Sequence, residues 1–114
     1  MKNRNKQLNA LLSGCLLTLA ASTIAWSAET KAGKATYDKL CLSCHGADGK
    51  GNPAMAKVMG EKALNIVGKE TQAKKDADML KVIVEGAGKM PASGKSLSPQ
   101  EQKDVLSYSR SLAK

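Results

Sequence analysis

The sequence predicts an all-α domain built from three main helices, one short helix and connecting loops. Apolar residues recur at helical spacing in three segments, and capping residues or glycines bound them. No stretch alternates apolar and polar residues as a half-buried strand does, and no repeat or internal linker divides the chain. The chain of 114 residues therefore predicts one folded domain.

The first main helix is expected over residues 31–44. Gly33, Tyr37, Leu40 and Cys44 recur there at helical spacing, so they share one face. That face is expected to turn toward the core.

Two further helices are expected in the middle of the chain. The short one covers residues 53–59, begun by Asn52 and ended by Gly60. The second main helix covers residues 76–85 and stops at Gly86. It carries acidic residues at its N-terminus and apolar residues on its expected buried face, namely Asp76 and Asp78, then Met79, Leu80 and Ile83.

The last main helix is expected over residues 98–113. Ser98-Pro99-Gln100-Glu101 has the pattern of a capping box with proline at the first helical position. Val105, Tyr108 and Leu112 then recur at helical spacing. The remaining segments, including 46–51 and 85–97, are expected to be loops.

The N-terminus has the pattern of an export signal. Lys2, Arg4 and Lys6 precede an apolar stretch over 8–25 that ends in small residues. We expect residues 1–28 to be a cleaved signal peptide, cut after Ser27 or Ala28, and residues 29–114 to be the mature domain. The stretch is short for a membrane span, although a retained anchor is the alternative. Cys15 follows a lipobox-like Leu-Ser-Gly but lies inside the apolar stretch, which favours a discarded residue over a lipidated one.

Removal of the signal lowers the positive charge of the protein. The whole chain carries a net charge of +8. Residues 1–28 contain three basic and no acidic residues, so the mature domain has a net charge of +5. Lysines spaced along helices with few aromatic residues form an ordinary solvated face, so no nucleic-acid partner is expected. They can steer docking onto an acidic partner.

Cys41-Leu42-Ser43-Cys44-His45 is the C-x-x-C-H pattern of covalent haem attachment. On a helical turn, positions i, i+3 and i+4 project from one face, so both sulfurs and the imidazole can reach one flat macrocycle. The mature domain contains no Phe and only Tyr37 and Tyr108 as aromatic residues. A buried porphyrin would supply the apolar volume that such a chain lacks.

Three other interpretations of the motif are weaker. A thioredoxin-like redox pair would follow a strand, whereas the preceding residues predict a helix. A structural zinc site usually needs four nitrogen or sulfur ligands, and the mature chain offers Cys41, Cys44 and its single histidine, His45. A chance match in a solvated loop is the third.

The mature chain, over about residues 30–112, resembles a class I c-type cytochrome of the small bacterial mono-haem kind. The resemblance rests on the order of the haem motif, a Met-Pro loop and a closing helix. Its carriers are Gly33 and Tyr37, Cys41-x-x-Cys44-His45, the Gly-x-Asp-Gly-x-Gly run ending at Gly51, Asn52-Pro53, Lys89-Met90-Pro91, and Tyr108. It implies the small cytochrome c fold, wrapped around one covalently bound haem.

The resemblance also implies roles for individual residues. Cys41 and Cys44 would form the thioether bonds, and His45 would be the proximal iron ligand. The carbonyl of Pro53 would accept a hydrogen bond from the other ring nitrogen of His45. Met90 would be the sixth ligand, with Met59 the next candidate and then Met55 and Met79. Gly33 and Tyr108 would lie where the first and last helices cross. Since no tryptophan remains after cleavage, the haem propionates have only candidate partners, Lys50, Lys57, Lys69 and Asn65.

Two protein ligands would leave no open position on the iron, which argues against oxygen or peroxide chemistry. The expected function is therefore a periplasmic one-electron carrier with one haem c, not an enzyme. It would be a monomer without stable membrane insertion that exchanges electrons with periplasmic or membrane-bound redox proteins. Two different functions remain open at this point: a dedicated haem subunit of a periplasmic dehydrogenase or oxidase, and a gas-binding or peroxidatic haem protein.

Overall fold

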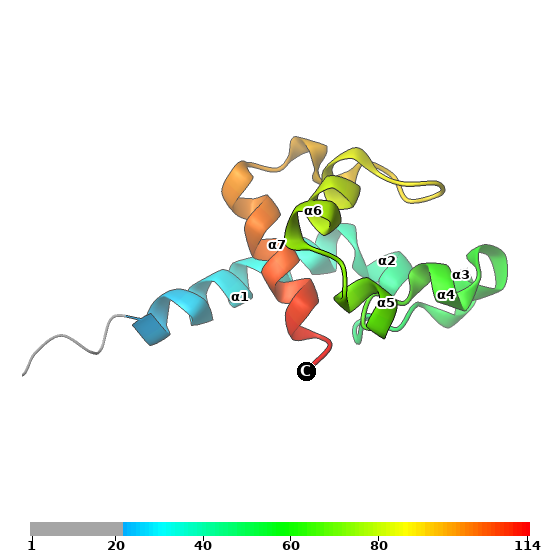
Figure 1. Ribbon diagram of the computed structural model, residues 1–114, viewed down its shortest axis with the longest axis horizontal. Coiled ribbons are helices and arrows are strands. Elements are labelled where there is room, and N and C mark those ends of the chain that lie inside the picture. The colour runs from blue at the N-terminus through cyan, green and yellow to red at the C-terminus, as the bar shows by residue number, and fades with distance from the viewer. Residues whose placement is uncertain (1–21) are drawn as a thin grey trace, which may run out of the picture.

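The computed structural model describes residues 22–114 of the chain, and all of its regular elements are helical (Figure 1). The charged start of the predicted signal, most of its apolar stretch and Cys15 lie outside the described residues. The helices in chain order are α1 (Ser22–Leu40), α2 (Leu42–His45), α3 (Pro53–Met59), α4 (Glu61–Leu64), α5 (Lys69–Gln72), α6 (Asp76–Glu85), the 3₁₀ helix η1 (Ser93–Ser96) and α7 (Pro99–Ser111). The predicted all-α fold class is confirmed.

The caps expected from the sequence are present. Asn52 accepts the backbone N–H of Ala54 at the start of α3. Ser98 and Glu101 form the reciprocal capping box of α7. The pKa of Glu101 is held below its ordinary value because the carboxylate accepts the backbone N–H of Ser98.

The structure corrects the expected helices in three places. The first helix begins earlier, at Ser22, and is interrupted at Cys41. The last helix ends at Ser111 rather than at residue 113. Three segments expected to be loops form the short helices α4, α5 and η1. Helices of four residues are too short to show an amphipathic pattern, so the sequence does not predict them. Helices this short depend on tertiary contacts for their stability.

Helices α1 and α7 cross at close range and form the most extensive helix contact (Figure 1). A Cβ atom on Gly33 would lie 2.0 Å from the carbonyl oxygen of Asp104 and 2.9 Å from Cβ of Tyr108, so only glycine allows this approach. The ring of fully buried Tyr37 meets that of Tyr108 edge to face, at a centroid distance of 5.2 Å. The predicted places of Gly33 and Tyr108 at this crossing are confirmed.

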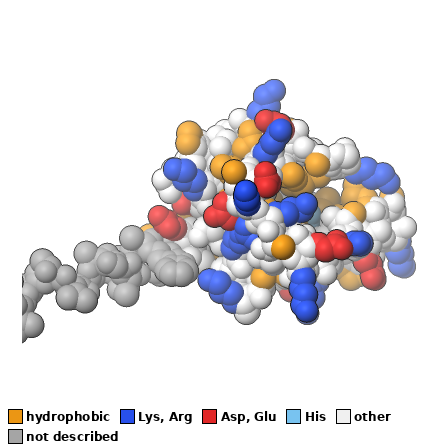
Figure 2. All heavy atoms as spheres, viewed as in Figure 1, with side chains coloured by type: hydrophobic (Ala, Val, Ile, Leu, Met, Phe, Trp, Pro, Cys, Tyr) orange, Lys and Arg blue, Asp and Glu red, His pale blue; other side chains and the backbone are white. Residues whose placement is uncertain are grey.

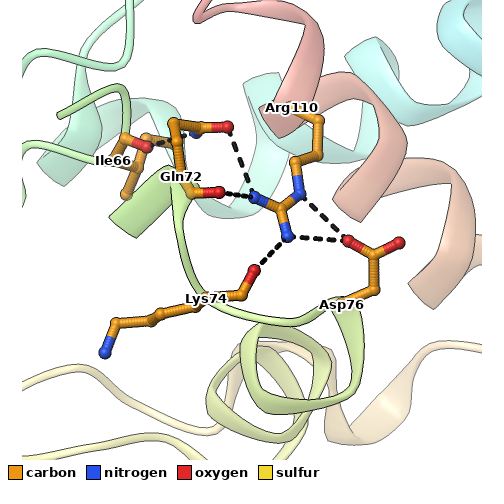
Figure 3. A network of polar contacts seen from close by, with 5 residues as sticks. All are labelled: Ile66, Gln72, Lys74, Asp76 and Arg110. Atoms are coloured by element: carbon orange, nitrogen blue, oxygen red, sulfur yellow. Dashed lines mark hydrogen bonds and ion pairs between the residues drawn. The ribbon is translucent and has the colours of Figure 1, made fainter. Parts of the chain in front are cut away.

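Arg110 of α7 binds the segment between α5 and α6 (Figure 3). Its guanidinium donates to the carbonyl oxygens of Gln72 and Lys74, at 2.9 and 2.6 Å, and to one carboxylate oxygen of Asp76, at 2.7 and 3.0 Å. The Gln72 side chain in turn donates to the carbonyl of Ile66. One side chain thus fixes the backbone that leads into α6.

Across residues 22–114, no helix combines the length and the hydropathy that crossing a membrane requires.

Candidate functional site

Residues 41–45 form one tight turn of helix directly after α1. The backbone N–H of Cys41 donates to the carbonyl of Tyr37 at 2.8 Å, and the N–H of His45 donates to the carbonyl of Cys41 at 2.9 Å. Cys41 keeps right-handed helical dihedral angles although α1 ends one residue earlier. The i, i+3 and i+4 relation of Cys41, Cys44 and His45 inferred from the sequence is therefore present, and neither cysteine is in a disulfide.

His45 is buried, and its Nδ1 atom lies 2.7 Å from the carbonyl oxygen of Leu64. A carbonyl can only accept a hydrogen bond, so Nδ1 carries the proton. The Nε2 atom is then the nitrogen with the free lone pair, which is the form needed to bind a metal. The acceptor expected at Pro53 is wrong, because Leu64 occupies that role and Pro53 begins α3 as its first residue.

The Leu64 carbonyl is held in place by contacts of the residues that follow it in the chain. The backbone N–H of Ile66 donates to the carbonyl of Gly49, at 2.8 Å, in the loop that follows His45. Asn65 accepts the backbone N–H groups of Val67 and Gly68 at 3.0 Å each. This turn joins the haem-motif loop to the start of α5 and fixes the direction of the carbonyl.

Met90 lies at the end of a tight turn that follows α6. The backbone groups of Ala87 and Met90 exchange two hydrogen bonds, at 2.9 and 3.1 Å. Gly86 has a φ of +77°, and a Cβ atom there would lie 2.6 Å from the Met90 carbonyl oxygen. A glycine at the end of α6 is therefore what lets the chain fold back and bring Met90 toward the haem motif.

Two cavities meet at the haem motif, and Cys41, His45 and Met90 border both of them. The helix-side cavity, of about 170 Å³, lies among α1, α6 and α7 and is lined mainly by apolar side chains, including Met79, Val82, Ile83 and Val105. The loop-side cavity, of about 340 Å³, also reaches Cys44 and the segment 87–91. In the view of Figure 2, hydrophobic side chains are most concentrated on the right, with lysine and arginine side chains spread over the visible surface.

The four methionines of residues 29–114 differ in their relation to these cavities. Met90 borders both cavities, Met59 borders only the loop-side cavity, and Met79 borders only the helix-side cavity, where it is buried on α6. Met55 lines neither of the two. Met90 is therefore the methionine best placed to share a ligand with His45.

Burial perturbs two ionisable groups beside the motif. Burial, with a smaller effect of neighbouring Cys44, raises the pKa of the Cys41 thiol to about 11, so it is a neutral thiol at neutral pH until it is modified. Burial also raises the pKa of Tyr37 above its ordinary value. The Tyr37 hydroxyl donates to the carbonyl of Gly46 at 2.7 Å and thus fixes the residue that follows His45.

The residues at this site fit a covalently attached haem. Two unpaired thiols and an imidazole with a free Nε2 project from one turn, and the adjoining cavities are mainly apolar, as the porphyrin faces require. Sequence reasoning missed Leu64 because its contribution is a backbone carbonyl, which no residue type announces. Of the candidate propionate partners, Asn65 borders the helix-side cavity, whereas Lys50, Lys57 and Lys69 border neither cavity.

Comparison with known protein families identifies a match over most of the chain. The family described as "Cytochrome C oxidase, cbb3-type, subunit III" matches residues 28–108, which include the haem motif, Met90 and the α1–α7 crossing. No curated protein matches the chain significantly. Domains of the matched family carry a covalently bound c-type haem with its iron, so the cofactor expected from the motif is confirmed.

Proposed function

We propose, from the premise that this chain belongs to the family of cytochrome c oxidase, cbb3-type, subunit III, that it is a periplasmic one-electron carrier with His45 and Met90 as axial ligands. Family membership makes the chain a c-type cytochrome and a haem-based electron carrier. The ligand pair, the compartment and the partners belong to the proposal.

The single observation that carries the ligand pair is the juxtaposition of His45 and Met90 at both cavities. The Leu64 carbonyl fixes the proton of His45 on Nδ1, which leaves Nε2 for the iron. Met90 also borders both cavities, and it lies in a turn after α6 whose backbone is fixed by two hydrogen bonds. An imidazole and a thioether can therefore face one another across the cofactor.

A c-type haem supplies a one-electron iron couple when it is bound. The residues of this chain determine how that couple is used. Cys41 and Cys44 would hold the group covalently at two points, and the apolar side chains of α6 and α7 would exclude water from it. Two protein ligands leave no open coordination position, which favours electron transfer over oxygen chemistry. The thioether of Met90 and the low polarity of the cavity both favour the ferrous state.

The compartment and partners follow from the N-terminus and the surface charge. The export signal expected over 1–28 and the covalent haem both fit the periplasm. The mature domain has an excess of lysines, so its partners would be redox proteins that present an acidic surface. Contacts of that kind are brief and weaken as salt is raised.

Carbon monoxide binding to the reduced holoprotein tests the ligand pair. Ferrous iron with two protein ligands gives a low-spin spectrum that carbon monoxide leaves unchanged. A high-spin or carbon-monoxide-reactive ferrous form would contradict this proposal and favour a gas-binding or peroxidatic protein.

A second candidate function is a haem subunit held permanently by one oxidase. The matched family is described as an oxidase subunit, which favours this function over a gas-binding or peroxidatic one. Purification at native expression separates a free shuttle from a dedicated subunit. A free shuttle runs as a monomer of mature size, whereas a dedicated subunit stays with its oxidase.

A further inference from the structure

Among residues 22–114, Lys74 is the only lysine or arginine that borders the helix-side cavity, and no carboxylate borders it. The titratable side chains that line this cavity are Tyr37, Cys41, His45 and Lys74. The cavity therefore offers one positive charge at its edge and no negative charge to oppose an anion. Apart from that edge, its lining is mainly apolar.

The other polar side chains of the cavity already have partners. The hydroxyls of Tyr37 and Ser109 donate to the carbonyls of Gly46 and Val105, and Thr71 donates to the carbonyl of Asn65. The amide oxygen of Asn65 accepts two backbone N–H groups. By contrast, the ammonium of Lys74 makes no hydrogen bond or ion pair with any residue from 22 to 114.

The backbone of Lys74 is fixed although its ammonium is not. Its carbonyl accepts from Arg110 at 2.6 Å, and its N–H donates to the carbonyl of Thr71. In Figure 3 the Lys74 side chain leaves this network and extends away from Arg110 and Asp76. The nearest charged groups of the network, Asp76 and Arg110, neutralise one another. A fixed backbone thus carries a lysine at the edge of the cavity, and the ammonium of this lysine is uncommitted.

From these observations we propose that Lys74 binds the propionate carboxylates of the haem. A haem carries its two carboxylates on the edge opposite its two vinyl groups, and the vinyl groups are taken by the cysteines. The carboxylates therefore belong at the end of the site away from the cysteines. Cys44 borders only the loop-side cavity and Cys41 borders both, so the part of the helix-side cavity beyond Cys41 is the end that remains for the carboxylates. Lys74 stands at the edge of the helix-side cavity, where its charge complements them.

The other lysines are less well placed for this role. Lys89 borders the loop-side cavity together with Cys44, on the side of the vinyl groups. Lys50 and Lys62 border a separate hollow beside α3 and α4. Lys75, next to Lys74 in the chain and also exposed, borders none of these cavities. It is therefore a matched control for Lys74.

The test is the pH dependence of the reduction potential in the mature holoprotein. Ionisation of a propionate favours ferric iron, so the reduction potential falls as the pH rises through the pKa of that propionate. A nearby cation lowers this pKa, so the potential of the wild type begins to fall at a low pH. Lys74→Gln is expected to raise the pH of this inflection by about one unit. Lys74→Arg keeps the charge and should keep the inflection of the wild type, as should Lys75→Gln. The potential is followed from about pH 3 to about pH 9, a range that begins below the ordinary pKa of carboxyl groups.

This proposal rests on the proposed haem site. The experiment distinguishes a failure of the Lys74 contact from a failure of the haem site itself. All three variants should retain covalent haem and a low-spin spectrum, because Lys74 is neither an attachment residue nor an iron ligand. An inflection in Lys74→Gln that coincides with that of Lys75→Gln would overturn the propionate contact. A colourless wild-type protein would instead overturn the haem site itself.

Discussion

The Nδ1 atom of His45 lies 2.7 Å from the carbonyl oxygen of Leu64, across 19 residues of sequence. This contact gives the imidazole both its orientation and its tautomer. Because the acceptor is a backbone atom, no substitution of Leu64 removes it directly. The strength of this hydrogen bond depends instead on the residues that pack against the backbone of Leu64. Gly51 is one of these residues, and a substitution can alter it.

Gly51→Ala should disturb the His45 contact. A Cβ atom at Gly51 would lie 3.0 Å from Cβ of Leu64, and the φ of +108° is one that alanine rarely adopts. We expect a loss of about 1–3 kcal/mol in the free energy of unfolding. We also expect a higher reduction potential, because a weaker bond from Nδ1 makes the imidazole a poorer donor to ferric iron.

Gly60→Ala is the control for backbone strain alone. Its φ of +87° is also strained for alanine, but a Cβ atom there meets nothing within 4 Å. It should cost similar stability and leave the potential unchanged. Equal shifts of the potential in the two variants would contradict the role given to Leu64.

Met90→Ala should abolish the low-spin spectrum and let the ferrous iron bind carbon monoxide. The covalent haem should remain, because Cys41 and Cys44 are unaffected. Met59→Ala, at the loop-side cavity alone, should keep both the spectrum and the resistance to carbon monoxide. If the effects of the two substitutions were exchanged, Met59 would be the sixth ligand.

Most of the helical framework could be predicted from the sequence, because its signals are local. Asn52 and Ser98 cap the helices expected of them, and α3 and α6 have the expected bounds. The identity of the histidine acceptor could not be predicted in this way. Any residue offers a carbonyl, and only the turn through Leu64 and Asn65 determines which carbonyl reaches His45.

The Arg110 network could not be predicted for a related reason. Two of its three acceptor residues, Gln72 and Lys74, contribute backbone carbonyls from more than 30 positions away, and sequence patterns carry no signal for such contacts. The short helix α5 lies next to these carbonyls, in a segment that has no helical periodicity.

Arg110→Met should destabilise the protein more than Asp76→Asn does. The Asp76 side chain is 74% exposed, so its ion pair with Arg110 is largely screened, and its loss should cost about 0.5 kcal/mol. The Arg110 guanidinium also satisfies the carbonyls of Gln72 and Lys74, so its loss should cost about 2 kcal/mol. Urea unfolding of the holoproteins measures both, and equal losses would show that the ion pair is the main contribution.

Tyr37→Phe should change how stability depends on alkaline pH. Burial raises the pKa of Tyr37 in the folded protein above its ordinary value of 10.0, so the unfolded chain releases this proton first. The stabilisation is therefore complete below about pH 10 and declines as pH rises above it. At neutral pH the variant should lose about 1 kcal/mol with the hydrogen bond to Gly46.

The comparison requires unfolding curves at neutral pH and above about pH 10, the ordinary pKa of tyrosine. The difference between wild type and Tyr37→Phe should narrow as the pH rises. Tyr108→Phe removes a hydroxyl from the other ring of the same pair and serves as the control. A difference between wild type and Tyr37→Phe that stays constant over this range would contradict the role of buried Tyr37.

Every function proposed for this protein depends on the attachment of one haem through Cys41, Cys44 and His45. An intact mass with an optical spectrum, on protein exported by cells that mature cytochromes c, tests this attachment most directly. We expect a mass equal to the polypeptide from about residue 28 onward plus one haem, and a low-spin c-type spectrum. A colourless protein with the mass of its amino acids alone would contradict the haem site.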